Sequence, residues 1–195
     1  MSEAIQRELS PSETPLWWGR PRQGLVIRGS DAFLIPFSLL WCGFAVFWEA
    51  SVLRAPHAPA FFALWGIPFV LVGVYFVVGR FFVEARQRAN TYYAVTSERV
   101  IIVSGVVTRT VKSLSLGTLT DLSVSETGAG EGTITFGAQH PMAPMFAGMR
   151  GWPGAEQQLG PRFDLICDAK SVYETIRSAQ RAVHLPPGPR THPTP

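Results

Sequence analysis

Two long apolar runs, separated by a short connection, restrict the fold of this chain more than any other feature. The first covers residues 33–53 and the second about 61–83, and the only formal charges from residue 32 to 79 are Glu49 and Arg54. As an α-helix rising about 1.5 Å per residue, the first run covers about 30 Å, the thickness of a bilayer core. The sequence therefore predicts two transmembrane helices.

A pair of buried helices in a soluble core is the alternative. The chain has only 195 residues, which leaves too little sequence to cover two such helices on every side. Charged residues make up 16% of the chain, below the roughly 25% usual for soluble domains. The charge-free part of the second run, residues 61–78, has only 18 residues, but Arg80 can snorkel to the interface, and Phe81, Phe82 and Val83 extend the apolar surface.

The connection contains two prolines, Pro56 and Pro59, and makes the pair a helical hairpin. Basic residues stand outside it, with Arg20, Arg22 and Arg28 before the hairpin and Arg80, Arg86 and Arg88 after it. The connection itself has only Arg54, together with His57. Since positive residues favour the cytoplasmic side of a membrane, both termini are expected in the cytoplasm. In this interpretation residues 1–32 are a polar cytoplasmic segment, unlike a secretory signal peptide.

Glu49 is the one acidic residue inside the first run, near its outer end. An ionisable group at membrane depth is a functional hypothesis, for example in transport or in a membrane enzyme. The alternative is that Glu49 reaches the interface or pairs with Arg54 at the mouth of the helix. Gly43, Gly66 and Gly73 are interpreted as positions of close helix approach.

The pattern changes to β-strands after Arg88, and residues 89–184 predict a separate domain. Two β-branched strands at Thr91–Thr96 and Arg99–Ser104 are joined by a tight turn at Ser97-Glu98. Further strands are expected within residues 106–116, 118–125, 133–136 and 163–167. Short strands at this spacing predict a small antiparallel sandwich or barrel.

A helix is expected after the last strand, with Asp168 as its N-cap. Its apolar stripe consists of Val172, Ile176, Ala179 and Val183, and Pro186 and Pro187 end it. Residues 185–195 are Pro-rich and are expected to be a disordered tail. The predicted fold class is a membrane α-helical hairpin followed by an α+β or mainly-β domain.

Three short motifs give a resemblance to a known family. Residues 91–105, TYYAVTSERVIIVSG, resemble the T-x-Y-x-[VL]-T-x-x-R-[IVL]…G opening of bacterial membrane proteins that contain a pleckstrin-homology (PH) domain. Residues 130–136, GEGTITF, are similar to the G-x-G-T-[IV] strand entry of that family. LWWGRP at residues 16–21 resembles the Trp-Gly segment that precedes its first helix, and the three motifs occur in the family's order.

The resemblance implies a multi-pass protein of the bacterial cytoplasmic (inner) membrane, with an N-terminal transmembrane hairpin at residues 33–86. It also implies a PH-like antiparallel β-barrel or sandwich over residues 89–184, capped by the C-terminal helix. The chain departs from the family pattern in an irregular insertion at about residues 137–162.

Basic residues near the predicted barrel are candidates for contact with the membrane or its lipids. They are Arg86, Arg88, Arg99, Arg109 and Lys112. PH domains that bind phosphoinositides cluster such residues on their first strands, and a cation close to an anionic leaflet contributes about 1 kcal/mol. The alternative is a solvated strand face beside a stop-transfer cluster.

The insertion is the most unusual feature of the predicted domain. Its apolar residues Met142, Met145, Phe146, Met149 and Trp152 are candidates for contact with a partner. Methionine and aromatic side chains form adaptable contact surfaces, and long loops in compact domains are often functional. Alternatively, these residues cover the barrel and serve packing alone.

No catalytic, cofactor-binding or metal-binding constellation emerges. The four histidines, His57, His140, His184 and His192, have no metal-type partner at short spacing, and Cys42 and Cys167 are expected to be free thiols. Gly128, Gly130 and Gly132 precede a strand rather than a helix, so a hairpin turn is preferred to a phosphate loop. The net charge of +3 is too weak to indicate nucleic acid.

The sequence therefore predicts a non-enzymatic, membrane-anchored interaction module. It would present its barrel at the cytoplasmic face to a protein partner or to a second copy of the chain. Two alternatives stay open: a domain that binds or senses anionic lipid, and an accessory subunit of a membrane enzyme or transporter that uses Glu49.

Overall fold

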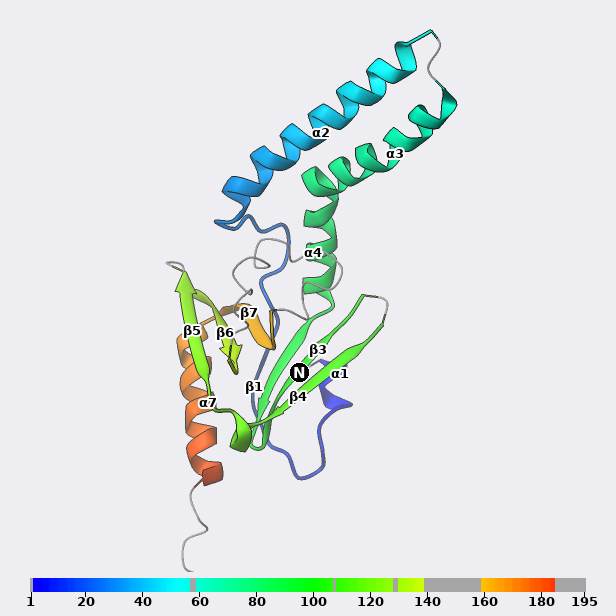
Figure 1. The fold of residues 1–195 in the computed structure, drawn as a ribbon. Helices are drawn as coiled ribbons and strands as arrows, with labels where there is room; N and C mark the ends of the chain where they lie inside the picture. Colours follow the sequence, from blue (N-terminus) through cyan, green and yellow to red (C-terminus); the bar gives the residue numbers. More distant parts are fainter. Residues whose placement is uncertain (1, 57–58, 107, 128–129, 139–158, 185–195) are drawn as a thin grey trace, which may run out of the picture. The chain divides into compact units, whose positions relative to one another are not determined.

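The computed structural model of the chain (Figure 1) describes residues 2–56, 59–106, 108–127, 130–138 and 159–184. The chain folds as two compact units. Among the described residues, the sheet unit consists of those within 2–23, 87–138 and 160–184, and the helical unit consists mainly of those within 24–86. With helices and two antiparallel sheets, the chain belongs to the α+β class.

Two antiparallel helices, α2 (Asp31–Arg54) and α3 (Ala60–Val74), make up most of the helical unit. A π-helical turn, η1 (Tyr75–Gly79), continues α3 into α4 (Arg80–Ala89), and Figure 1 shows the helix changing direction there. The spans Asp31–Arg54 and Ala60–Ala89 are long and apolar enough to cross a membrane. In the described structure only 17% and 11% of their most apolar windows are buried, whereas the core helix of a soluble protein is mostly buried.

In the described part of the sheet unit, seven strands form two antiparallel sheets. The first sheet has the order β1 (Pro15–Gly19), β2 (Tyr92–Thr96), β3 (Arg99–Ser104) and β4 (Thr110–Ser115). A 3₁₀ turn, η2 (Leu116–Thr118), leads to the second sheet of β5 (Leu122–Thr127), β6 (Glu131–Phe136) and β7 (Arg162–Cys167). Among the described residues the two sheets are not joined by strand pairing, so they do not close into a barrel.

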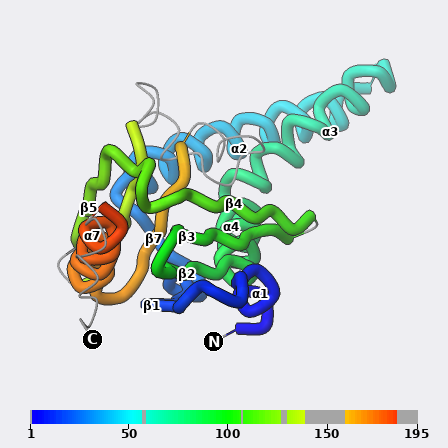
Figure 2. Tube along the Cα trace, turned by 90° about the horizontal axis from the view of Figure 1, so that it is seen from below, coloured from blue at the N-terminus to red at the C-terminus, as the bar shows by residue number. Residues whose placement is uncertain are grey.

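The main core lies between the two sheets and the C-terminal helix α7 (Ala169–His184), which Figure 2 shows beside β5. Alternate residues of β2 and β3 enter this core, among them Tyr93 and Ile102. The predicted stripe on α7 is confirmed, because Val172, Ile176 and Ala179 are buried in the same core. Its last member, Val183, lies beyond the core and is exposed.

β5 and β6 pair as consecutive antiparallel strands, which agrees with the predicted hairpin, while Gly128 lies outside the described residues. Thr127 of β5 pairs with Glu131 of β6, and Gly130 has a φ of +74°, a conformation that glycine adopts without strain. Gly132 has a different role. A Cβ at that position would stand 2.6 Å from the Ala169 Cβ, so the missing side chain lets β6 pack closely against α7.

Residues 1–23 fold together with the strands, whereas the sequence analysis placed residues 1–32 in a segment of their own. β1 pairs with β2, and the short helix α1 (Glu3–Gln6) packs on the face of the sheet opposite the main core. There Ile5 is buried against Ala94, Ile101 and Val103. This second small core explains why the β3 sequence is continuously apolar, because both faces of the strand are covered.

Candidate functional site

The chain leaves the sheet unit and returns to it at neighbouring positions. Gly19, at the end of β1, lies opposite Tyr93 near the start of β2. The Arg20 guanidinium donates a hydrogen bond to the Ala89 carbonyl and lies 4.6 Å from the centre of the Tyr92 ring. The entire helical hairpin is thus inserted in the connection between two adjacent antiparallel strands.

Side chains of residues 20–23 fix this exit. Gln23 donates from Nε2 to the Arg88 carbonyl at 3.2 Å, so Gln23 and Arg20 together satisfy two carbonyls at the end of α4. The Arg22 backbone N–H donates to the Leu165 carbonyl at 2.8 Å, and its side chain forms an ion pair of 2.9 Å with Glu131. Residues 20–23, where the chain leaves the sheet unit, are therefore held in place by specific hydrogen bonds and an ion pair.

The outer face of the first sheet, turned away from the main core, is largely apolar. Strand register places Trp18, Ala94, Ile101 and Ser113 in one row across the four strands. A second row on the same face runs from Tyr92 through Val103 to Val111. Residues 2–14, called the strap below, cover the middle of this face through Ile5, Ala4 and Leu9.

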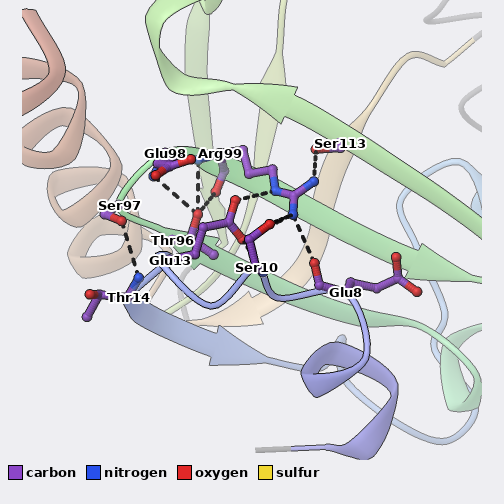
Figure 3. Close-up of polar contacts among 9 residues, drawn as sticks. All are labelled: Glu8, Ser10, Glu13, Thr14, Thr96, Ser97, Glu98, Arg99 and Ser113. Carbon is purple, nitrogen blue, oxygen red and sulfur yellow. Dashed lines mark hydrogen bonds and ion pairs between the residues drawn. The ribbon is translucent and has the colours of Figure 1, made fainter.

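Arg99 holds the strap to the sheet through a dense set of polar contacts (Figure 3). Its Nε lies 2.6 Å from Glu13 Oε1, and its Nη2 donates to Glu13 Oε2 at 3.1 Å. The guanidinium also donates to the Glu8 carbonyl at 2.9 Å and to the Ser113 hydroxyl at 3.3 Å. Among the described residues the hydrogen bond from Arg99 to the Glu13 carboxylate comes from Nη2, while Nε makes a close ion-pair contact without hydrogen-bond geometry. A hydrogen bond between two ionised groups is stronger than one between neutral groups.

The Glu13 carboxylate is almost completely buried, since its side chain is 2% exposed. Burial of this kind makes the ion pair specific, because a carboxylate without Arg99 would be left uncompensated. At the end of the strap Thr14 and the turn after β2 exchange hydrogen bonds, from Ser97 N to the Thr14 carbonyl and from Thr14 N to Ser97 Oγ. The C-terminal end of the strap is therefore fixed through both Glu13 and Thr14.

A second arginine binds the strap further along the same face. Arg109, which precedes β4, forms an ion pair of 2.8 Å with the Glu8 carboxylate. Its Nη2 also donates to the Ala4 carbonyl at 2.7 Å. Arg99 and Arg109 thus both recognise a carboxylate together with a free backbone carbonyl of the strap.

The turn between β2 and β3 is confirmed as a structural turn. The Thr96 hydroxyl accepts hydrogen bonds from the backbone N–H groups of Glu98 and Arg99 and donates to the Arg99 carbonyl. Thr96 has no exposed surface, and the bonds close a tight loop of the type that Thr favours. The turn places the Arg99 side chain on the outer face.

The five candidate lipid-contact residues do not form one patch. Arg99 and Arg109 lie on the outer face and are paired with Glu13 and Glu8. Lys112 lies opposite Ile102 in the β3–β4 register, so it is on the other face of the sheet. The remaining two belong to α4, where Arg86 is exposed and Arg88 is 7% exposed.

The helical unit contains a buried ion pair that the sequence did not reveal. Arg80 Nη2 lies 2.8 Å from Asp31 Oδ1, and the two side chains are 6% and 7% exposed. Asp31 also accepts a hydrogen bond from the Arg28 backbone N–H at 2.7 Å. Arg80 was expected to snorkel towards an interface, but it instead joins the start of α2 to the start of α4, with its guanidinium 4.5 Å from the Phe81 ring centre.

Two of the three expected close-approach glycines lie at the contact between α2 and α3. A Cβ on Gly73 would stand 2.9 Å from the Cys42 Cα, and a Cβ on Gly66 would overlap the Glu49 carboxylate. Gly43, in contrast, has nothing within 4 Å of its would-be Cβ. Close approach at Gly66 and Gly73 is confirmed, and Gly43 faces open space.

Glu49 points towards α3, where Gly66 leaves room for it. Its Oε2 is buried without a hydrogen-bond partner among the described residues. The ion pair with Arg54 considered from the sequence is not formed in this part of the chain, and Arg54 is exposed. This oxygen therefore lies beside Gly66 without a hydrogen bond to any described residue.

Other expected features lie partly outside the described residues. The candidate partner-contact residues Met142, Met145, Phe146, Met149 and Trp152 all do. Within the described ranges, no three His, Cys, Asp or Glu side chains gather in a way that could hold a metal ion. Cys42 and Cys167 are free thiols, as expected.

Sequence reasoning missed the acidic partners Glu8, Glu13 and Asp31. In each case the arginine that binds the carboxylate lies far along the chain. Only arginines beside or within apolar segments, such as Arg80 and Arg99, could have indicated that acidic partners exist. No protein-family model matches the chain, and neither the curated proteins nor the solved structures contain a significant match.

Proposed function

We propose that this chain is a membrane-anchored, non-enzymatic interaction module that presents its sheet unit to protein partners at the cytoplasmic face. The observation that carries the proposal is the helical hairpin inserted between two paired strands, with its apolar side chains uncovered. Fold alone does not assign function, so the proposal rests on this anchor and on the surfaces that the sheet unit offers.

The uncovered side chains of the hairpin support a membrane location. Among them Leu40 is 74% exposed and Phe47 is 70% exposed. Leaving a Leu or Phe side chain in water instead of burying it costs about 1.5–3 kcal/mol, and both helices carry many such residues. A bilayer removes this cost without requiring any further protein.

The connectivity of the strands supports an even number of membrane crossings. Because Gly19 and Tyr93 are paired, the segments before and after the hairpin have to be on the same side of the membrane. Two helices satisfy this condition and one does not. The basic residues that flank the hairpin favour the cytoplasmic side.

The order of elements supports a PH-like fold for the sheet unit. A four-stranded antiparallel sheet is followed by a three-stranded one and then by a helix packed on the core between them. The family motif at residues 91–105 coincides with β2, the Thr96 turn and β3. We include a bacterial PH-domain membrane protein in the proposal on these grounds.

Anchoring gives a mechanism in which weak contacts suffice. A tethered domain meets other membrane proteins at a high effective concentration, so that modest affinity produces substantial occupancy. A protein partner is favoured over lipid because Arg99 and Arg109 bind backbone carbonyls as well as carboxylates, a combination that a peptide provides. A lipid headgroup would have to displace both ion pairs and would satisfy neither apolar row.

The rival role for Glu49 in transport or membrane catalysis has less support. A transport path needs a chain of polar groups, whereas the part of Glu49 that is buried contacts Gly66 and has no bonded partner in the described structure. A polar side chain that packs against a glycine of the neighbouring helix can be accommodated in a helix pair without a functional role.

Two measurements on the full chain in its native membranes test the proposal. After alkaline carbonate treatment the chain is expected to stay in the membrane pellet. Amine-reactive crosslinking in intact cells, followed by mass spectrometry, is expected to give a specific protein adduct. Release of the chain into the supernatant would contradict the membrane anchor. Recovery of the uncrosslinked chain alone at every crosslinker length would contradict the protein partner.

A further inference from the structure

We propose that the strap is an internal occupant of a peptide-binding surface, and that the partner of this surface is a short acidic amphipathic segment of another protein. The inference rests on the proposed function and identifies the surface, the class of partner and the means of control. In the closed form described here, residues 2–14 occupy the site in cis. A partner segment in trans displaces them.

The chemistry of the strap defines what the surface accepts. Ile5, which is 1% exposed, fills the apolar centre between Ala94, Ile101 and Val103. Glu8 and Glu13 then place carboxylates on Arg109 and Arg99. An occupant therefore needs an apolar side chain followed by acidic groups, as in the strap itself, where both acidic residues lie after the short helix α1.

The guanidinium groups recognise the backbone of the occupant as well as its charges. Arg109 binds the Ala4 carbonyl, and Arg99 binds the Glu8 carbonyl. These are free carbonyls in and after the short helix α1, where the backbone has no helical partner of its own. Any peptide that ends a helical turn at this point offers the same acceptors, and a lipid headgroup or a free phosphate does not.

The surface is wider than the segment that covers it. Trp18 lies in the same cross-strand row as Ala94 and Ile101, yet it is 52% exposed. At the opposite edge Val111 pairs with the buried Val103 and is 39% exposed. A longer partner segment can cover these flanks as well, which gives it contacts that the strap lacks.

The strap is also expected to bind this surface weakly, because it contains little regular structure of its own. Its helix α1 has only four residues, far shorter than a helix that is stable in water by itself. The strap keeps its place mainly because it is covalently attached, which gives it a high effective concentration at the site. A free segment with better contacts can therefore replace it.

A fluorescent peptide of residues 2–14 is the probe, and the full chain in lipid nanodiscs is the receptor. In the receptor, the double change Glu8→Gln and Glu13→Gln removes both ion pairs of the cis strap without altering the sheet. We expect this variant to bind the probe at least tenfold more tightly than the unchanged chain does. Glu3→Gln is the matched control, because Glu3 pairs only with Arg7 inside the strap, and this variant is expected to bind like the unchanged chain.

A further change in the receptor tests the recognition itself. Adding Arg109→Gln to the weakened-strap receptor is expected to reduce probe binding at least tenfold, and Arg109 precedes β4, outside the strands. Thermal unfolding of each receptor shows whether the fold is kept. A probe carrying both Glu→Gln changes is expected to bind no receptor.

Three results overturn the inference. They are equal probe binding by the unchanged and weakened-strap receptors, probe binding that Arg109→Gln leaves unaltered, and binding of the weakened-strap receptor to anionic vesicles but not to the probe. None of these three results bears on the proposed membrane-anchored module, which carbonate treatment and crosslinking test separately. Failure of this inference is therefore distinguishable from failure of the proposed function.

Discussion

Gly19 lies directly opposite Tyr93 in the antiparallel pair of β1 and β2, although the whole helical hairpin separates them in the sequence. The sheet can form only when the chain has returned from the hairpin, so folding of the sheet unit depends on a long-range closure. The same pairing requires that both flanks of the hairpin share one side of any membrane. The pairing of β1 with β2 therefore links the folding of the sheet unit to the number of times the hairpin crosses a membrane.

The buried pair of Asp31 and Arg80 is predicted to stabilise the helical unit. Asp31→Asn leaves the Arg80 charge buried and unpaired, and we expect a loss of about 3 kcal/mol in the free energy of unfolding. Arg80→Gln is expected to have a similar effect. Denaturant titration in detergent micelles measures the loss. The comparison is Glu3→Gln at the exposed Glu3–Arg7 pair, where at most about 1 kcal/mol is expected, and equal losses at both sites would contradict the assignment.

Gly73 is predicted to be intolerant of a side chain. Gly73→Ala places a methyl group 2.9 Å from the Cys42 Cα, and because backbone cannot give way, α2 and α3 have to separate. We expect a destabilisation of about 1–3 kcal/mol in the same titration. Gly43→Ala, on the open side of α2, is expected to be neutral or slightly stabilising, because Ala is the better helix former. If the two variants behave alike, α2 and α3 do not pack in this register.

Glu49 is predicted to lower the stability of the hairpin and to have no functional role. Glu49→Leu removes a buried oxygen that has no bonded partner among the described residues, so we expect a gain of about 1–3 kcal/mol in the stability of the hairpin. Partner crosslinking is expected to be unchanged in Glu49→Gln. A destabilised Leu variant, or loss of the crosslinked partner in the Gln variant, would restore the functional role for this residue.

Arg99→Lys is predicted to loosen the strap although the charge is kept. A single ammonium group cannot contact both Glu13 oxygens and the Glu8 carbonyl at once. We expect amide hydrogen exchange in residues 2–14 to accelerate about tenfold, which corresponds to about 1.4 kcal/mol of opening free energy. Arg7→Lys changes an arginine that pairs only within the strap and serves as the control. Unaltered exchange in Arg99→Lys would show that the strap is held by its other contacts, those of Ile5, Arg109 and Thr14, and not by the Arg99 guanidinium.

The elements that the sequence predicted well are those whose pattern is local. Long apolar runs with very few charges identify α2 and α3, and the β-branched residues identify β2 and β3 within a residue of their ends. The stripe of Val172, Ile176 and Ala179 identifies α7 in the same way. In each case the signal is a period within one segment, which needs no knowledge of the partner.

β1 and the strap could not be predicted because their signals are not local. Leu16–Gly19 is too short to show a strand period, and its partner strand lies beyond the hairpin. Arg99 and Glu13 are 86 residues apart, so one sequence offers no reason to pair them rather than any other two charges. For that reason Arg99 and Arg109 were candidates for lipid, and their acidic partners were overlooked.

Cysteine labelling of the full chain tests the anchored hairpin most directly. Cys167 is an exposed thiol of the sheet unit, and Ala55→Cys places a second thiol in the connection after α2, with Cys42 replaced by Ser. In intact bacterial cells we expect a membrane-impermeant maleimide to label position 55 and to reach Cys167 only after the membrane is opened. Labelling of Cys167 in intact cells, or equal labelling of both positions under all conditions, would contradict a cytoplasmic module held by a two-helix anchor.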